Sequence, residues 1–374
     1  MSLFLLVFLV LYGLANLYVF AKLGAVIQAT AWRVVVGLLL AAMAAAPVLV
    51  HMLDRARHFR MAKPFGAVTY TWLAVVMWFC VLAAAVDLWN LAMRAFGASG
   101  KRAMLPPQVS LAGIGALVVA GLVWGFIEAQ RIRVQHVVID VPNLPAGLEN
   151  LRLVQITDLH LGIHTGQRRL ERTVELARQL KPDILISTGD LVDSPLEEVM
   201  PLAPLLRELQ APLGKFAVLG NHEYYAGLGT SLAFHREAGF KLLRGQAVSV
   251  TEELVLAGVD DQAGNYTNQE CHSDESAALG QARPAGVVVL LKHQPRVSQA
   301  SLGRFDLQLS GHTHGGQVFP WHLLARLVYP MYQGLHKLPQ DCWLYASRGS
   351  GTWGPKIRLF ARPEVTLITF RRAQ

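Results

Sequence analysis

The stretch LRLVQITDLH at residues 151–160 decides how the larger part of this chain folds. Its apolar, β-branched first half is typical of a buried strand, and Asp158 and His160 follow where that strand ends. Four later stretches repeat this order of an apolar run and then polar residues: DILISTGD (183–190), KFAVLGNHE (215–223), GVVVLLKHQP (286–295) and DLQLSGHTH (306–314). Together they predict five strands that bring Asp, His and Asn side chains to one rim of a sheet.

Helical patterns alternate with these strands in the first half of the region. Apolar residues at helical spacing predict helices at 166–180, 196–209 and 230–238, and this alternation implies a mostly parallel sheet. In the second half, residues 247–250 and 254–259 are separated by a short turn, as in a hairpin. Further strands are expected at 287–291, 307–309, 343–346 and 365–370. The pattern therefore predicts an α/β fold with enough strands for two sheets.

The front of the chain is too apolar for a wholly soluble protein. Of 374 residues, 53% are hydrophobic and only 16% are charged. Charge-free runs of about 20 residues, long enough to cross a ~30 Å hydrocarbon core, occupy residues 3–20, 34–52, 65–86 and 109–127. One such run can be a buried core helix, but four in succession with basic residues between them predict an all-α transmembrane region of about four helices. The first run lacks a charged start and a small-residue cleavage site, so we expect it to be retained.

This division predicts the domain organisation. We expect a membrane domain at 1–130, a linker with a first strand at 131–150 and a catalytic domain at 151–374. Six basic residues would lie on the catalytic side of the membrane and five on the other, namely Arg55, Arg57, Arg60, Lys63, Arg131 and Arg133 against Lys22, Arg33, Arg94, Lys101 and Arg102. The positive-inside rule thus favours a cytoplasmic catalytic domain. The net charge of +8 comes largely from such residues, which favour anionic lipid over nucleic acid.

The chemistry of the motif residues favours a metal centre. Hydrolysis of a phosphoester needs a nucleophile at neutral pH and stabilisation of negative charge, and two metals about 3.5–4 Å apart supply both through metal-activated hydroxide. Mixed Asp, Asn and His donors suit Mn, Fe or Zn better than Mg or Ca, which prefer oxygen alone. The three cysteines, Cys80, Cys271 and Cys342, have no metal-binding spacing, and a disulfide between the last two stays open.

In their order along the chain, the five motifs resemble those of the calcineurin-like metallophosphoesterase superfamily, over about residues 154–370. The resemblance implies a two-sheet αββα sandwich and two divalent metal ions. It assigns the ligands residue by residue: Asp158, His160 and His314 to the first metal, Asn221, His293 and His312 to the second, and Asp190 as the bridge. It also implies that His222 is catalytic, as acid for the leaving group or stabiliser of the phosphoryl group, with Asp193 as the carboxylate that orients its ring.

The tail after the last motif resembles the membrane-associated bacterial branch of this superfamily, some members of which act on lipid-linked phosphodiesters or pyrophosphates. This implies an inner-membrane location and a membrane lipid or lipid-linked phosphoester as the partner. The apolar stretch at 318–332 is then either core packing under a loop or a lip that dips into the membrane beside the metals.

Several alternatives remain at this level. The enzyme could be a phosphomonoesterase or a phosphoprotein phosphatase, because metal ligands do not encode the substrate. A nuclease would need a basic groove with stacking aromatics, and a scaffold or transporter would need ionisable residues within its spans, which the sequence largely lacks. Three side chains near the motifs are each open to two interpretations. His164 could contact the substrate or be an exposed loop residue. Glu223 could support the metal ligands or cap a turn, and Arg348 could bind phosphate or form a structural salt bridge.

Overall fold

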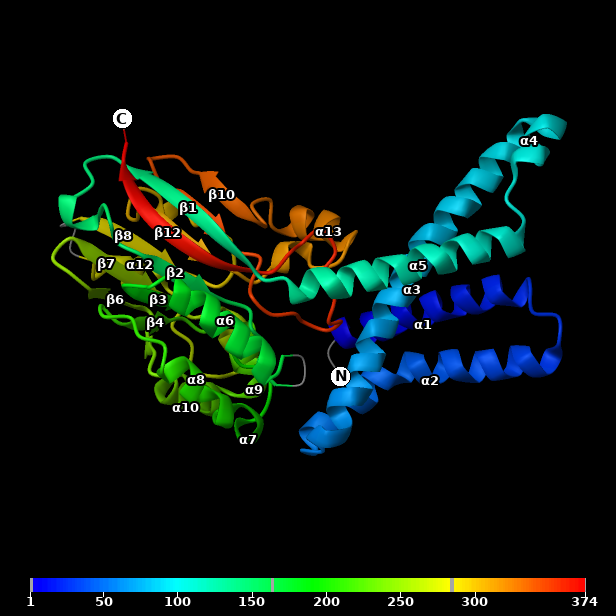
Figure 1. Ribbon diagram of the computed structural model, residues 1–374, viewed down its shortest axis with the longest axis horizontal. Helices are drawn as coiled ribbons and strands as arrows, with labels where there is room; N and C mark the ends of the chain where they lie inside the picture. The colour runs from blue at the N-terminus through cyan, green and yellow to red at the C-terminus, as the bar shows by residue number, and fades with distance from the viewer. Residues whose placement is uncertain (1–2, 163–164, 283–285, 374) are drawn as a thin grey trace. The chain divides into compact units, whose positions relative to one another are not determined.

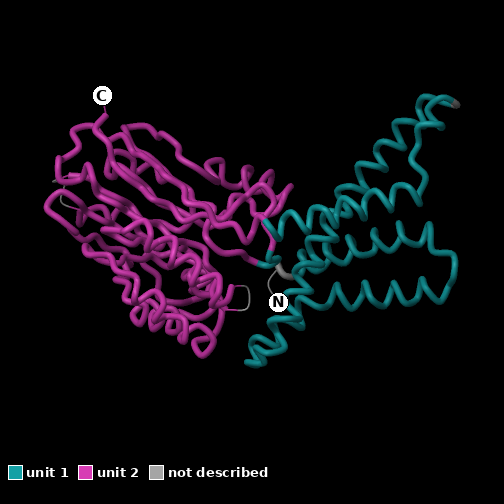
Figure 2. Tube along the Cα trace, in the orientation of Figure 1, with its two compact units in different colours: residues 1–127, 354–356 teal, residues 128–353, 357–374 magenta. Residues whose placement is uncertain are grey.

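The computed structural model describes residues 3–162, 165–282 and 286–373, so His164 lies outside the described residues. The chain forms two compact units, shown in Figure 2. Unit 1 comprises Met1–Ile127 with Gly354–Lys356, and unit 2 comprises Glu128–Trp353 with Ile357–Gln374.

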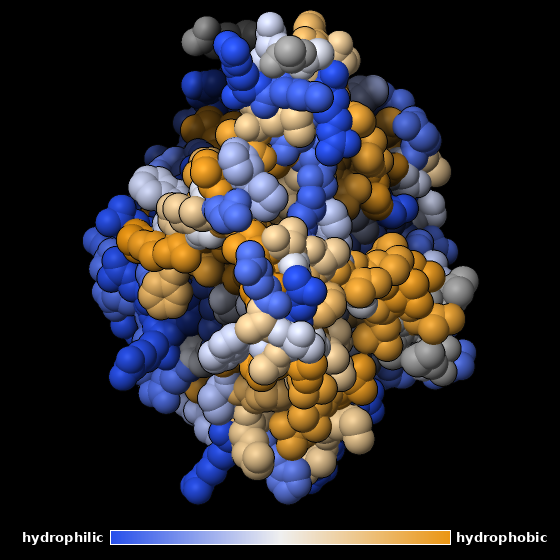
Figure 3. Space-filling model, turned by 90° about the vertical axis from the view of Figure 1, so that its right-hand side faces the viewer, coloured by the Kyte–Doolittle hydropathy of each residue, from blue (hydrophilic) through white to orange (hydrophobic). Residues whose placement is uncertain are grey.

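Unit 1 is all helical: α1 (Leu3–Gly24), α2 (Thr30–Arg55), α3 (Phe59–Ala95), the short α4 (Gly97–Ala103) and α5 (Pro107–Gln130) (Figure 1). Four of these helices are long and apolar enough to cross a membrane, which confirms the predicted transmembrane region. Large apolar side chains such as Leu38, Leu88 and Leu117 lie exposed on them, and broad apolar patches are visible in Figure 3. At 37 residues, α3 is about 55 Å long, so it extends beyond a ~30 Å hydrocarbon core.

Polar contacts join α1 and α3 near the end of the predicted third span. The Tyr18 hydroxyl donates a hydrogen bond to Asp87 Oδ2 (2.6 Å), and Lys22 forms an ion pair with the same carboxylate. A carboxylate with two such partners is well placed at the boundary between lipid and water.

Unit 2 contains two six-stranded sheets. The order of the first is β1 (Arg133–Val141), β12 (Glu364–Arg372), β2 (Leu153–Ile156), β3 (Ile184–Ser187), β4 (Lys215–Ala217) and β5 (Lys241–Leu242). The order of the second is β10 (Gly334–Lys337), β11 (Trp343–Ala346), β9 (Leu307–Ser310), β8 (Val287–Leu291), β7 (Leu254–Gly258) and β6 (Gln246–Ser249). Both sheets are mixed: β12 runs antiparallel to β2, and the edge strands β10 and β6 are antiparallel to their neighbours. The β6–β7 hairpin was predicted.

Side chains that alternate along each strand build three apolar layers. Leu153 and Ile184 of the first sheet pack against residues such as Val289 of the second, in the core between the sheets. Their neighbours Val154 and Leu185 point the other way, into a core covered by α6 (Gln167–Gln179), α8 (Ala203–Arg207) and α10 (Leu228–Glu237). The helix α12 (Glu275–Gly280) packs on the outer face of the second sheet. This is the expected sandwich of helices, two sheets and helices.

One local feature differs from the prediction made from the sequence, and the sequence left another open. The single helix expected at 196–209 is broken into α7 (Leu196–Val199), η2 (Met200–Leu202) and α8, because Pro201 and Pro204 have no backbone N–H to continue a helix. The cysteines are free, including Cys271 and Cys342. The remaining short elements are η1 (Ala146–Leu148), α9 (Asn221–Ala226), α11 (Ala263–Tyr266), η3 (Gln299–Ser301), η4 (His314–Gly316) and α13 (Trp321–Val328).

The strand directions define one edge of unit 2 that matters for function. Because β2, β3 and β4 are parallel, their carboxyl ends meet at the same edge. Since β12 runs antiparallel to β2, with Thr366 opposite Gln155, β12 begins at that edge. So does β1, whose Arg133 N–H donates to the Pro363 carbonyl (2.9 Å). We call this edge the rim.

Candidate metal centre

Every predicted metal ligand follows a strand that ends at the rim. Asp158 comes two residues after β2, and Asp190 comes three residues after β3. His293 and His312 each follow their strands, β8 and β9, by two residues, and Asn221 begins the helix after β4. Residues separated by more than 150 positions are therefore brought to one place by sheet topology.

The first cluster consists of Asp158, His160 and His314, whose ligand atoms lie within 4.8 Å of one another. The Nε2 atoms of His160 and His314 are 3.0 Å apart, and His314 Nε2 is 3.7 Å from Asp158 Oδ1. Asp158 and His160 are fully buried and His314 is nearly so. Two imidazole nitrogens and a carboxylate thus converge on one point.

The second cluster consists of Asp190, His293 and His312, again within 4.8 Å. His293 Nε2 lies 3.1 Å from Asp190 Oδ2 and 3.1 Å from His312 Nδ1. Asn221 Oδ1 lies 3.1 Å from His293 Nε2 and 3.0 Å from His312 Nδ1, so the amide oxygen joins this cluster.

Asp190 lies between the two clusters. Its Oδ2 atom is 3.7 Å from His160 Nε2 in the first cluster and 3.1 Å from His293 Nε2 in the second. This position allows one carboxylate to serve both clusters.

The backbone at these ligands is held in a costly conformation. Asp158, His160, Asp190, His312 and His314 all have positive φ angles, between 51° and 72°. For residues other than glycine, this left-handed region costs about 1–2 kcal/mol each. Such strain persists only where the surrounding structure enforces it, and it concentrates at functional sites.

The glycines of the motifs have a steric role. A Cβ atom on Gly311 would lie 2.2 Å from Asp158 Oδ2, and one on Gly220 would lie 2.2 Å from Asp190 Oδ1. Since such contacts are impossible, only glycine lets the neighbouring backbone approach these carboxylates. The glycines of the GNH and GHTH motifs therefore make room for the carboxylates of Asp158 and Asp190, while the other motif residues include predicted ligands.

Glu223 organises the backbone around Asp190. Its fully buried carboxylate accepts four backbone N–H groups: those of Asp190 (2.8 Å), Leu191 (2.7 Å), Val192 (3.1 Å) and Gly220 (2.7 Å). Burial, together with the charge of Asp190, raises the pKa of Glu223 to about 7. Of the two interpretations left open by the sequence, a residue that supports the predicted ligands and a turn cap, these contacts favour the first, since Glu223 supports the Asp190 loop.

Hydrogen bonds fix the ring orientation of two histidines. His293 Nδ1 lies 2.7 Å from the Thr188 carbonyl, which can only accept, so Nδ1 carries the proton and the Nε2 lone pair faces the cluster. The Tyr329 hydroxyl donates to Gln294 Oε1 (2.9 Å) and therefore accepts from His312 Nε2, at 2.9 Å. The lone pair of His312 Nδ1 is thereby aimed at Asn221 and His293.

A buried arginine fixes His314. Arg358 is fully buried, and its guanidinium donates to the carbonyl oxygen of His314 (2.8 Å) and lies 3.0 Å from the Nδ1 atom of the same ring. The Nε2 atom is then the ring nitrogen that faces His160. Nothing in the sequence distinguished Arg358 or Tyr329 from other polar residues, because both act through contacts distant in sequence.

The pKa shifts of residues in the clusters indicate where a positive charge is favoured. Burial acts to raise the pKa of Asp190, but the neighbouring His293 and His222 hold it well below its usual range. Burial acts to lower the pKa of His293, but the charge of Asp190 raises it well above its usual range. Burial lowers the pKa of His312 to about 3, so this ring is neutral at physiological pH. A cation between Asp190 and these rings is thus electrostatically favoured.

Divalent metals fit this donor set. Carboxylate, amide and imidazole atoms converge with their lone pairs directed inward, and within the described residues the buried Asp158 Oδ2 atom has no hydrogen-bond partner. A buried carboxylate oxygen in that state is costly unless a cation accompanies it. Nitrogen and oxygen donors together are typical of Mn, Fe or Zn sites.

His222 and Asp193 form a pair beside the two clusters. His222 Nδ1 lies 2.6 Å from Asp193 Oδ1, and His160 Nδ1 is 3.5 Å from the other oxygen of that carboxylate. Burial opposes the charge on His222, but Asp193 and Asp190 outweigh it and raise its pKa to about 9. The half-exposed rings of Tyr225 and Trp353 meet His222 edge-on, with centroid distances of 5.2 and 5.7 Å.

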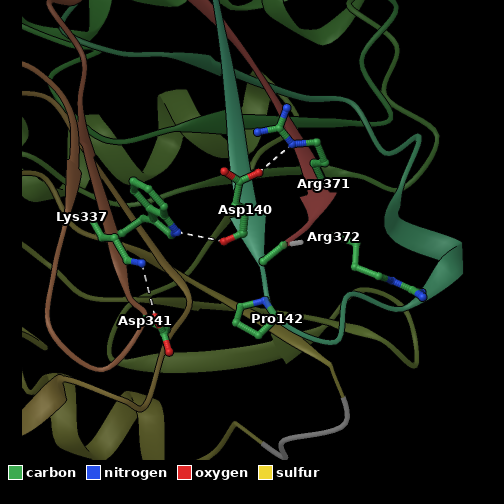
Figure 4. Close-up of a pocket in the computed structure, with 8 residues that line it drawn as sticks. Asp140, Pro142, Lys337, Asp341, Arg371 and Arg372 are labelled. Atoms are coloured by element: carbon green, nitrogen blue, oxygen red, sulfur yellow. Dashed lines mark hydrogen bonds and ion pairs between the residues drawn. The ribbon is translucent and has the colours of Figure 1, made fainter.

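Two other polar features do not belong to this centre. Arg348 pairs with the buried Glu364 (3.0 Å), which favours the interpretation of this residue as part of a structural salt bridge. Figure 4 shows a hollow at the opposite end of β1 and β12, lined by residues that include Asp140, Lys337 and Arg371. Its charges pair among themselves, with Arg371 Nε 2.7 Å from Asp140 Oδ1, and it offers no cluster of ligands.

Comparison with known proteins gives a consistent result. Residues 151–316 match the family described as calcineurin-like phosphoesterase. An uncharacterized metallophosphoesterase of Aquifex aeolicus is 41% identical over 249 residues, which cover 66% of this chain and 95% of that protein. Two proteins described as transmembrane proteins with a metallophosphoesterase domain are also similar. The one from Danio rerio is 34% identical, covering 71% of this chain and 63% of that protein, and the one from Bos taurus is 31% identical, covering 83% and 74%.

Proposed function

The chain belongs to the calcineurin-like metallophosphoesterase family, and from this premise we propose that it is a membrane-tethered hydrolase that cleaves phosphodiester or pyrophosphate bonds with two divalent metals. The observation that carries the proposal is the position of Asp190 between two ligand clusters, with the His222–Asp193 pair beside them.

Each ligand has a defined place in the proposal. Asp158, His160 and His314 would hold one metal, and Asn221, His293 and His312 the other, with Asp190 shared by both. Mn, Fe or Zn is the expected identity, from the mixture of nitrogen and oxygen donors. When bound, such metals lower the pKa of water and neutralise charge on phosphoryl oxygens.

His222 would supply the proton that the leaving oxygen needs. Asp193 accepts the Nδ1 proton, which orients the ring and leaves Nε2–H as the group able to donate. The nearby carboxylates raise the pKa of His222, so the ring is protonated at neutral pH and ready to act as an acid. Tyr225 and Trp353 border this atom and limit the directions from which a leaving group can approach.

A lipid-linked substrate is the finer part of the proposal. A soluble substrate gains nothing from the attachment of the enzyme to four membrane-spanning helices. A substrate confined to the same membrane gains effective concentration. We propose the bacterial inner membrane as the location and a cytoplasmic catalytic unit, on the excess of basic residues described above. Phosphomonoester or phosphoprotein hydrolysis by the same residues is the second candidate, since the ligands serve either reaction.

A substrate screen tests the proposal. The detergent-solubilised full chain, loaded with Mn, is assayed on a phosphomonoester, a phosphodiester and a pyrophosphate model compound, with the His222→Ala variant as control. We expect hydrolysis of the diester or the pyrophosphate that depends on both Mn and His222. Preference for the monoester would favour the second candidate, and hydrolysis of none of the three would contradict the proposal.

A further inference from the structure

The helix α13 and the residues around it carry an apolar surface that the hydrolysis site does not use. In α13 no residue is buried, although most of its side chains are apolar. The exposed fractions reach 79% for Leu327 and 73% for the nearby Phe360. We call this set the α13 surface: Trp321, Leu323, Leu324, Leu327, Val328 and Phe360. Its exposure excludes the interpretation of α13 itself as core, although Val318, at the start of the 318–332 stretch, is buried.

Contacts within unit 2 place this surface at the rim. Phe319, just before α13, meets Phe360 edge-on with a centroid distance of 6.0 Å. Phe360 lies three residues before Pro363, and the carbonyl of Pro363 accepts a hydrogen bond from the backbone N–H of Arg133 (2.9 Å). Arg133 in turn is three residues after Gln130, the last residue of α5. Three residues span at most ~11 Å, so the chain itself keeps the start of β1, at the rim, within that distance of the end of α5.

The α13 surface also borders the metal centre. Tyr329 follows the last residue of α13 directly, and its hydroxyl lies 2.9 Å from Nε2 of His312. At the other end, His314 in η4 lies seven residues before Trp321, the first residue of α13. A ligand that covers this surface therefore lies next to the residues proposed to hold the metals.

Two exposed basic residues flank the apolar side chains of this surface. Other charges near in sequence do not face it, because Lys337 pairs with Asp341, Arg348 pairs with Glu364 and Arg358 is fully buried. Arg326 lies on α13 itself, and Arg362 follows Phe360 by two residues. An apolar helix with basic flanks is typical of segments that lie in the interface of an anionic bilayer, where Lys and Arg are attracted to the lipid headgroups.

We propose that the α13 surface inserts into the lipid bilayer, so that the rim with its metal centre faces the membrane. We infer a lipid bilayer as the partner of this surface, because the membrane-spanning helices of the same chain hold a bilayer within reach of the rim in every molecule. Insertion does not require catalysis. If the proposed function also holds, insertion brings a phosphate in the headgroup region to the metals.

Depth-dependent quenching tests the insertion directly. The full chain is reconstituted in vesicles that contain anionic lipid, with Cys80 and Cys271 replaced and the buried Cys342 kept. An environment-sensitive dye is attached at Leu327→Cys. The control carries the dye at Glu208→Cys, an exposed residue beyond α8, near the start of β4 and thus at the edge opposite the rim. We expect blue-shifted emission, quenched by lipids with a nitroxide in the acyl chain, for the first position and water-like emission for the second.

Two outcomes would overturn the proposal. One is water-like emission at Leu327→Cys. The other is apolar emission that nitroxide lipids do not quench, which would mean that a second copy or another protein covers the surface. Thermal unfolding of both labelled chains checks that they are folded.

A second measurement separates this proposal from the proposed function. Replacement of Phe319, Trp321 and Leu324 by Ser should reduce turnover of a long-chain phosphodiester at least tenfold while sparing a water-soluble nitrophenyl ester. Equal losses on both substrates, with a lower melting temperature, would mean that these side chains support the fold and would contradict insertion. A wild-type chain that inserts but hydrolyses neither ester would contradict the proposed function alone.

Discussion

Replacement of Glu223 by Gln tests the way in which the fold holds the carboxylate of Asp190. In the wild type, Oε1 accepts the N–H groups of Leu191 and Val192, and Oε2 accepts those of Asp190 and Gly220. Gln keeps one acceptor oxygen but turns an NH₂ group toward the other two donors. Two buried N–H groups then lose their partners, at about 1–3 kcal/mol each.

The expected total of roughly 2–6 kcal/mol should appear in two measurements. We expect the melting temperature of unit 2 to fall, and the dissociation constant for Mn to rise by at least about tenfold, because the loop that carries Asp190 is no longer fixed. Calorimetric Mn titration and thermal unfolding of the full chain measure both. The matched control is Glu237→Gln, a partly exposed residue whose ion pair with Arg207 (3.1 Å) contributes little. Unchanged melting and Mn affinity in the Glu223 variant would refute this account of the loop.

Two further predictions concern the two histidines with opposite pKa shifts. His222→Ala should lower kcat by about two to four orders of magnitude with metal content retained, and Asp193→Asn should give a smaller loss; loss of metal from the His222 variant would instead make it a ligand. Burial lowers the pKa of His235 from 6.5 to about 4, so the unfolded chain binds its proton first as the pH falls. The contribution of the buried neutral ring to the free energy of unfolding is complete above pH 6.5. It should decrease by about 2 kcal/mol between pH 7.5 and pH 5. In His235→Leu, the melting temperature should therefore fall less between pH 7.5 and pH 5 than in the wild type. If it falls equally in both, the titration of His235 does not cause the decrease.

The features that the sequence predicted well are those set by local pattern. The strand before Asp158 and the strand before Asp190 each read as a short apolar run, and β-propensity and burial act together there. The membrane-spanning helices were equally clear because about 20 apolar residues without charge have few other stable arrangements. The order of the motifs then predicted which residues meet at the rim.

The features that the sequence did not predict depend on contacts between distant residues. Arg358 reads as one basic residue among many, and only the fold buries it against His314, 44 positions earlier in the chain. Tyr329 belongs to an apolar run, and its hydroxyl meets His312 only because η4 and α13 turn the chain back. The break in the predicted helix after Val199 could have been predicted from the sequence. Pro201 and Pro204 lack a backbone N–H, and this outweighs the helical spacing of the apolar residues.

The apolar stretch at 318–332 shows a different limit. Periodicity cannot tell a helix that faces a protein core from one that faces lipid, because both present the same side chains. Only the exposure of Leu327 and the contact between Phe319 and Phe360 distinguish the two.

The most direct test of the central claim, that Asp190 joins two metal sites in a phosphoester hydrolase, is the metal content of wild type and Asp190→Asn after reconstitution with Mn and removal of free metal. Mass spectrometry of the purified full chain gives the number of bound ions, and hydrolysis of a phosphodiester is measured on the same samples. We expect two ions per wild-type chain, and in the variant the loss of bound metal together with almost all hydrolysis. An Asp190→Asn chain that keeps two ions and the full rate would contradict the claim.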